Sequence, residues 1–117
     1  PYIRGVMNAE LHNAGHASDM QEHASDAAGL MKALGNESRL MILCILAEGE
    51  RSVGELNDMV PLSQSALSQQ LARLRKQGLV KTRRESQTIY YSLSSGPADQ
   101  VINLLHDIYC GRQECSA

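Results

Sequence analysis

The stretch LSQSALSQQL, residues 62–71, constrains the fold more than any other part of the chain. Leu67, Leu71 and Leu74 recur at i, i+4 and i+7, which predicts a helix with one buried stripe. Around that stripe lie small amides and hydroxyls that suit base edges and phosphate oxygens: Gln64, Ser65, Ser68 and Gln69. Basic side chains follow at once: Arg73, Arg75 and Lys76. We therefore expect this helix to lie in a groove of a nucleic acid.

The bulk composition permits a small DNA-binding domain. With 117 residues and 43% hydrophobic side chains, the chain supports one domain with a modest core. The formal net charge is −2, but six of the eleven Lys and Arg residues lie between Arg73 and Arg84, so the positive field is local. No apolar run approaches the roughly 18 residues of a membrane span, and no signal peptide is evident. We expect a cytoplasmic protein without a membrane partner.

Helix signals divide the first half of the chain. Residues 1–17 read as a flexible tail and residues 112–117 as a second one, which leaves one domain over residues 18–111. Ser18 and Gln21 form a capping box for a first helix, which Gly35 ends. A second helix follows, and its segment 40–47 is apolar on every side. We expect protein to surround that segment completely.

Two short helices follow in close succession. Ser52 and Glu55 form a capping box, Pro61 closes the short helix that they start, and Ser63 starts the next. This tight helix, turn, helix order is the helix-turn-helix signature, and its second helix, which Gly78 ends, holds the recognition position.

Strand signals and a last helix complete the pattern. Residues 79–84 and 88–93 alternate like the strands of a hairpin, and Gly96-Pro97 opens a final helix that ends at Gly111. The fold class is mainly α, a winged helix-turn-helix with five helices and a two-stranded β-hairpin wing. The first and last helices carry more apolar surface than one small core uses, so we expect a homodimer through them.

Several motifs together resemble the ArsR/SmtB family of winged-helix repressors: ALGNESRLMILCIL, SVGELN, LSQSALSQQLARLRKQGLV and IYYSL. The resemblance covers about residues 25–110. It implies a dimer whose recognition helices enter successive major grooves, roughly 34 Å apart, on a palindromic double-stranded DNA operator.

The resemblance also implies that Gln64, Ser65, Ser68 and Gln69 face DNA, although the family often has His in place of Gln69. The remaining predicted DNA contacts are Ser63, Arg73, Arg83 and Arg84. The alternative for Arg83 and Arg84 is a charged strand edge that discourages aggregation, and we expect at least one of the two to reach phosphate.

The metal-sensing positions of the family carry no ligands here. Ser52 stands where members that sense metals through this region have Cys. The positions matching the zinc ligands of the final helix are Ser95, Pro97, Ile108 and Gly111. No catalytic residue, metal site or cofactor is therefore predicted.

Cys44 and Cys110 are placed as in the thiol-sensing branch of the family, the BigR, SqrR and HlyU-like proteins. The resemblance implies that persulfides or oxidants link the two sulfurs and lower operator affinity. Such transient bridges are typical of cytosolic thiols. The alternative for Cys44 is simple packing in an apolar helix. Cys115 matches nothing in that branch.

Two other functions stay open. His106 and Cys110 lie at i, i+4, and with the N-terminal histidines they offer ligands for zinc or another thiophilic metal, which would make the protein a metal-responsive repressor. A winged-helix module that binds a protein partner is the third possibility. The sequence does not predict an enzyme, because it shows no nucleophile-base pair, phosphate loop or closed metal motif.

Overall fold

The computed structural model describes residues 11–111 and the side chains of residues 19–111. Its elements in chain order are α1 (Leu11–Leu34), α2 (Glu37–Glu48), β1 (Arg51–Ser52), α3 (Val53–Met59), α4 (Gln64–Lys76), β2 (Val80–Glu85), β3 (Thr88–Leu93), α5 (Pro97–His106) and the π-helical turn η1 (Asp107–Gly111). Two compact units divide the chain, with the boundary after Lys32. None of the described helices combines the length and apolar character that a membrane span requires.

Helix α1 begins at Leu11, so the predicted start at Ser18 is wrong. Ser18 lies inside the helix, and Gly15 does not interrupt it, although an interior Gly costs about 1 kcal/mol relative to Ala. The segment 11–17, predicted as part of a flexible tail, is therefore helical, while residues 1–10 lie outside the described part. Most described side chains of α1 are exposed, including Met20 and Met31.

Helix α2 starts as predicted and is buried on one side only. The Asn36 side chain accepts a hydrogen bond from the Arg39 backbone N–H at 3.0 Å and caps the helix. Ile42, Leu43 and Leu46 are buried. Cys44 and Ala47, in contrast, are exposed. The expectation that the chain surrounds segment 40–47 completely is therefore wrong, because the described chain covers the face with these two small side chains only in part.

The predicted helix-turn-helix is confirmed in α3 and α4. The capping box at the start of α3 has both of its hydrogen bonds, at 2.8 and 3.1 Å between Ser52 and Glu55. The Ser63 hydroxyl caps α4 by accepting from the Ala66 N–H at 3.1 Å. Gly78, at φ +78°, ends α4 in a Schellman motif, in which the Leu79 N–H donates to the carbonyl of Leu74 at 3.0 Å.

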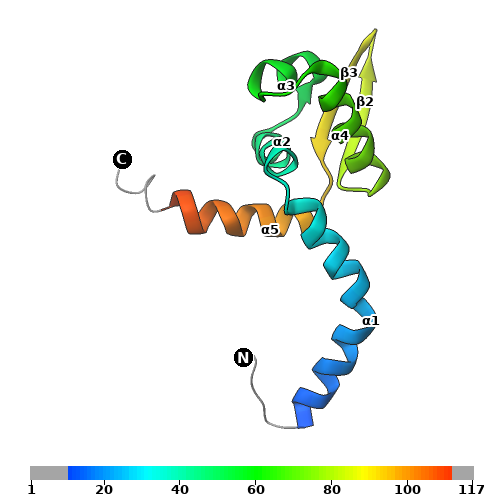
Figure 1. Cartoon of the computed structure of the whole chain (residues 1–117), viewed down its shortest axis with the longest axis vertical. Helices are drawn as coiled ribbons and strands as arrows, with labels where there is room; N and C mark the ends of the chain where they lie inside the picture. The colour runs from blue at the N-terminus through cyan, green and yellow to red at the C-terminus, as the bar shows by residue number, and fades with distance from the viewer. Residues whose placement is uncertain (1–10, 112–117) are drawn as a thin grey trace. The chain divides into compact units, whose positions relative to one another are not determined.

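The predicted hairpin is also confirmed, and it has a third strand beside it. Strands β2 and β3 pair antiparallel from Val80↔Leu93 to Glu85↔Thr88, and the sheet order is β1-β3-β2. Strand β1 is only Arg51–Ser52, too short to have a periodic sequence signal. Figure 1 shows α4 and the hairpin on one side of α2.

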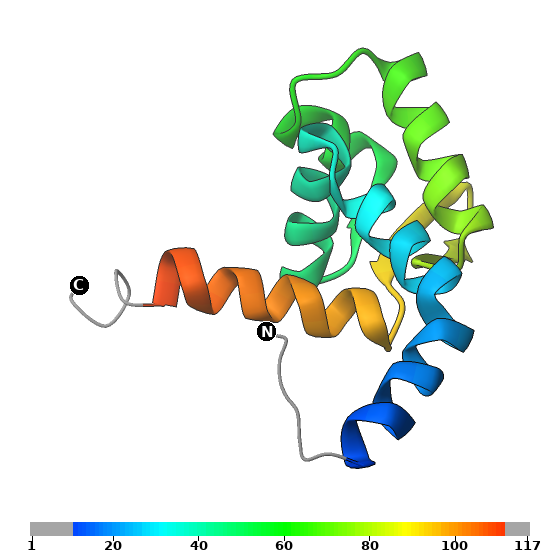
Figure 2. The same ribbon diagram turned by 60° about the horizontal axis from the view of Figure 1, so that its bottom comes forward.

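Helix α5 closes the second unit. Pro97 stands in its first turn, and Ala98 and Ile102 are its buried residues. Figures 1 and 2 show α5 crossing the end of α2. The final turn from Asp107 to Gly111 is π-helical, so the helical segment widens at the end of the described residues.

Candidate DNA-binding surface and thiol pair

Helix α4 separates its apolar and polar side chains onto opposite faces. Leu67, Leu71 and Leu74 are at most 1% exposed. Burying a leucine contributes about 1.5–3 kcal/mol, so these three hold α4 firmly against the core. The predicted DNA-contact residues of this helix and its cap are all exposed: Ser63, Gln64, Ser65, Ser68, Gln69 and Arg73. The arrangement presents a fixed row of hydrogen-bonding side chains to the outside.

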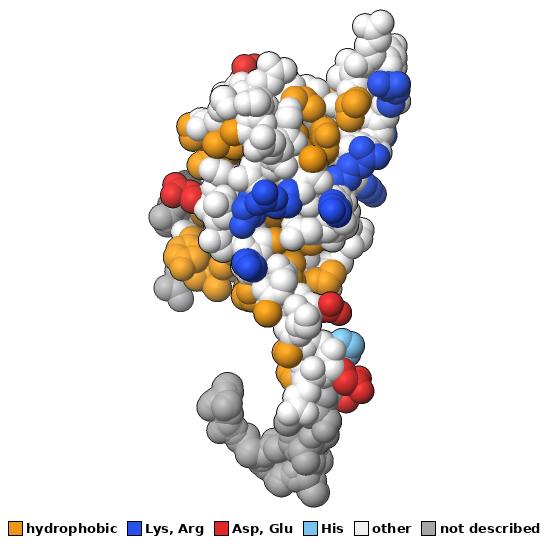
Figure 3. Space-filling view, turned by 45° about the vertical axis from the view of Figure 1, so that its right-hand side comes forward, with side chains coloured by type: hydrophobic (Ala, Val, Ile, Leu, Met, Phe, Trp, Pro, Cys, Tyr) orange, Lys and Arg blue, Asp and Glu red, His pale blue; other side chains and the backbone are white. Residues whose placement is uncertain are grey.

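Positive charge follows the polar row. Arg73, Arg75 and Lys76 lie in the last turn of α4, and Arg84 lies on β2 of the wing. Figure 3 shows Lys and Arg side chains in several patches on the face it presents. Within the described part of the chain, no carboxylate forms an ion pair with Arg73, Arg75 or Arg84. Their charges are available to phosphates.

Arg83 differs from its neighbour because carboxylates of the chain already hold it. Its guanidinium donates to both carboxylate oxygens of Glu50, with contacts of 2.8 to 3.1 Å, and to Glu85 at 3.0 Å. It also lies 4.6 Å from the centroid of the Tyr90 ring. The hydrogen bonds from Arg83 lower the pKa of Glu50 below its usual value.

This network ties the wing to the segment between α2 and α3. Glu50 and Arg83 are 33 residues apart in sequence, and no local pattern marks their pairing. Arg83 and Arg84 were both predicted to contact DNA. Of the two, Arg84 is the one that pairs with no carboxylate among the described residues. Sequence reasoning missed Glu50 altogether.

One predicted sensor thiol lies on α2, and the other lies in the turn directly after α5, the helix that packs against α2. Cys44 lies on α2 and is exposed, whereas Cys110 lies in η1 and is half-buried, and both are free. Partial burial raises the pKa of the Cys44 thiol, and the nearby Cys110 and Glu48 raise it further. Helix α2 packs against α5, and the turn that carries Cys110 follows α5 directly.

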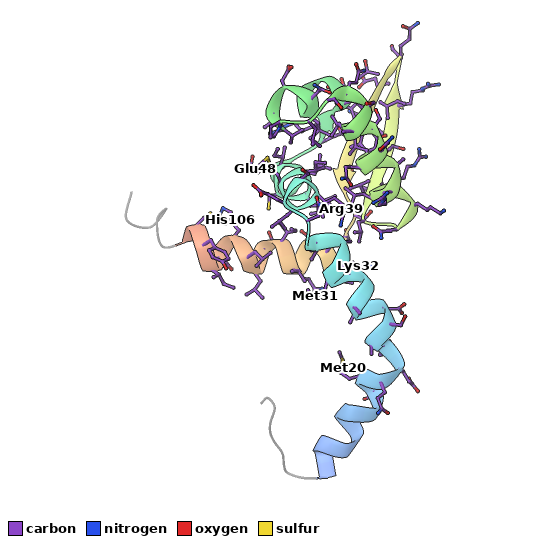
Figure 4. The ribbon with its side chains drawn as sticks, viewed as in Figure 1. Met20, Met31, Lys32, Arg39, Glu48 and His106 are labelled. Carbon is purple, nitrogen blue, oxygen red and sulfur yellow. The ribbon has the colours of Figure 1, made fainter. Side chains whose placement is uncertain are left out.

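A pocket of about 200 Å³ adjoins Cys44 between α2 and α5. Its lining residues are Cys44, Ala47, Glu48, Ile102, Asn103 and His106. Figure 4 shows Glu48 and His106 on the same side of the corner where α2 meets α5. Among the described residues, no three His, Cys, Asp or Glu side chains are grouped so as to hold a metal ion. The side chains of His12 and His16, and Cys115, lie outside the described residues.

Together the α3–α4 turn and the hairpin beside it define the class: this is a winged helix-turn-helix DNA-binding protein. Residues 36–82 match the family described as "Bacterial regulatory protein, arsR family". The transcriptional activator HlyU of Vibrio cholerae is 49% identical over 111 residues, which cover 94% of this chain and 95% of that protein. The biofilm growth-associated repressor of Xylella fastidiosa is 44% identical over 96 residues, 82% of this chain and 84% of that protein.

Solved structures agree with these sequence relationships. HlyU from V. cholerae matches with a TM-score of 0.74 at 54% identity, over 78% of this chain and 99% of that one. The crystal structure of the repressor BigR from X. fastidiosa has the same TM-score of 0.74, at 45% identity, over 80% of this chain and 96% of that one. The chain belongs to the arsR family, in the branch that contains HlyU and BigR. It is a transcriptional regulator and not an enzyme.

Proposed function

We propose that the protein binds a palindromic operator as a homodimer and is released when persulfides or other oxidants link Cys44 to Cys110. The observation that carries this proposal is the packing of α2, which carries the exposed Cys44, against α5, whose following turn carries Cys110. Because its target is chromosomal DNA, we place the protein in the cytoplasm, where a disulfide serves as a transient switch.

The linking reaction needs only a persulfide, RSSH. One cysteine thiolate attacks its terminal sulfur and becomes Cys–SSH, while the S–S bond of the donor breaks and RS⁻ leaves as RSH after protonation. The second thiolate attacks the cysteine-bound sulfur, forms the bridge and releases HS⁻. The two cysteines lose two electrons and the persulfide takes them up. Polysulfides with longer chains leave additional sulfur atoms in the bridge.

Exposed apolar side chains support dimerisation through the end of the chain. Leu104, Ile108 and Tyr109 are 56%, 57% and 71% exposed on α5 and η1. A contiguous apolar patch of this kind is typical of a protein interface. A second copy is the partner we assign to it, because two recognition helices must be joined at a fixed spacing of roughly 34 Å to read a palindrome.

The switch would act through α2. Arg39 on α2 contacts Gln70 on α4 at 3.5 Å, so α2 touches the recognition helix directly. The other side of α2 carries Cys44. A covalent bridge from Cys44 to the turn after α5 would join α2, and the recognition helix α4 that it contacts, to the segment that we assign to the dimer interface. We expect this link to change the spacing of the two recognition helices.

Operator binding before and after sulfur treatment tests the proposal. Reduced protein should bind, and polysulfide should weaken binding while adding whole sulfur atoms between Cys44 and Cys110 by intact-mass and peptide analysis. Cys44→Ser and Cys110→Ser should each stay bound after treatment. Cys115→Ser serves as the control and should respond as the parent chain does. Equal release of the Cys44→Ser protein would overturn the mechanism.

A further inference from the structure

The pocket between α2 and α5 is small and partly open to solvent. Its volume of about 200 Å³ is below the roughly 300–1,000 Å³ of pockets for drug-sized molecules. At about 30 Å³ for each water, it holds several waters or one small organic group. The bulk of a larger sulfur carrier would have to remain in solvent.

A nucleophile forms part of the pocket wall. Cys44 lines the pocket together with the apolar side chains of Ala47 and Ile102 and the polar groups of Asn103 and His106. A donor that enters therefore meets the sulfur directly. Asn103 is held in place, because its side-chain amide donates to Asp99 at 3.2 Å. The pocket therefore combines a small volume, hydrogen-bonding groups and a thiol.

A carboxylate at the rim sets the charge of this site. Glu48 lies one helical turn after Cys44, on the same face of α2, and lines the same pocket. Its side chain is 70% exposed, and it lies 4.0 Å from the Arg51 guanidinium, at the outer limit of an ion pair. At this distance Arg51 neutralises the charge of Glu48 only in part. The remaining negative charge near Cys44 agrees with the raised pKa of that thiol.

We infer that this pocket receives the sulfur donor before reaction, and that Glu48 favours small uncharged donors, such as a neutral low-molecular-weight persulfide, over anionic ones. The inference rests on the proposed thiol switch and adds the ligand class. Cys44 accepts the terminal sulfur of RSSH, becomes Cys–SSH and releases RS⁻, which takes up a proton. Cys110 then attacks the Cys44 sulfur and expels HS⁻.

Two alkylating agents that differ in charge test the role of Glu48. In a Cys110→Ser, Cys115→Ser chain, Cys44 is the remaining thiol. Its rates with neutral iodoacetamide and anionic iodoacetate are compared as a ratio, which cancels any change in thiolate fraction. Glu48→Gln should lower the ratio of the iodoacetamide to the iodoacetate rate by about threefold at low salt, and less at physiological salt, where the Debye length is about 8 Å.

A matched control removes the same charge from the other end of α2. Glu37 is exposed in the first turn, away from the pocket, so Glu37→Gln should leave the ratio unchanged. If the ratio of the two alkylation rates fell equally in both variants, the net charge of the protein would be responsible. If the ratio did not fall in Glu48→Gln, the carboxylate would have no role. Either outcome would overturn the selectivity.

A second variant tests the pocket itself. Ala47→Leu keeps a good helix former but narrows the space beside Cys44. It should slow sulfur transfer from a small neutral persulfide to Cys44 severalfold while operator binding of the reduced protein stays normal. An unchanged rate would overturn the pocket as the entry site. If instead this neutral persulfide fails to link the cysteines of the parent chain, the proposed switch fails, and the alkylation ratio still reports on the pocket.

Discussion

Helices α4 and α5 share an amphipathic pattern but leave different faces exposed. Helix α4 buries its three leucines completely and exposes amides, hydroxyls and basic groups. Helix α5 buries Ala98 and Ile102, whereas Leu104 remains 56% exposed. One helix has completed its apolar packing within the chain and offers a polar face. The other still has apolar surface to cover, so we assign DNA to the first and a second copy to the second.

The largest expected effect is loss of a buried leucine from α4. Leu71 is 1% exposed, so Leu71→Ala should lower the free energy of unfolding by about 3 kcal/mol, through lost burial and the cavity left behind. Urea unfolding measures the change. In the monomer, Leu104→Ala should lower the free energy of unfolding by about 0.5 kcal/mol or less, because Leu104 is exposed there. Similar losses from both substitutions in monomeric protein would contradict the contrast between the helices.

A charge placed on each exposed face should separate dimerisation from DNA binding. Leu104→Glu together with Ile108→Glu places carboxylates in the apolar patch, so the protein should become monomeric and lose tight operator binding. Gln69→Glu on α4 should leave the dimer intact and weaken operator binding by repelling phosphates. Sedimentation and operator titration measure the two properties. A double variant that remains dimeric would show that this patch is not the interface.

Arg73→Ala should weaken operator binding by a smaller, salt-dependent amount. One phosphate contact per half-site contributes about 1 to the slope of log affinity against log salt, so the slope should become shallower by about 1 for each half-site. Titrations at several salt concentrations measure it. If the parent chain shows no steep salt dependence and no specific duplex binding, the polar face of α4 serves a protein partner instead.

The smallest expected effect distinguishes the two arginines of the wing. Arg84→Gln should weaken operator binding a few-fold and reduce the salt slope, because no carboxylate of the described chain pairs with Arg84. Arg83→Gln should change the salt slope less, since Glu50 and Glu85 already neutralise its charge. The same titrations provide the comparison. An equal change in slope would mean that Arg83 leaves its carboxylates on binding DNA.

Short-range signals in the sequence predicted much of the fold. The caps at Asn36, Ser52 and Ser63 and the glycine end at Gly78 each depend on groups within a few residues of one another. The leucine spacing of α4 is equally local. These signals predict the order and type of the elements because the hydrogen bonds and buried stripes that carry them lie within single helices and turns.

Contacts between distant segments required the tertiary structure. The path of the chain brings Glu50 to Arg83 across 33 residues, pairs the two-residue β1 with β3, and leaves Cys44 at the pocket beside α5. None of these has a local pattern, because each depends on how separate elements meet. The sequence by itself determined which helices form and what their faces carry. Packing decided which charges are neutralised and which thiol lies open to solvent.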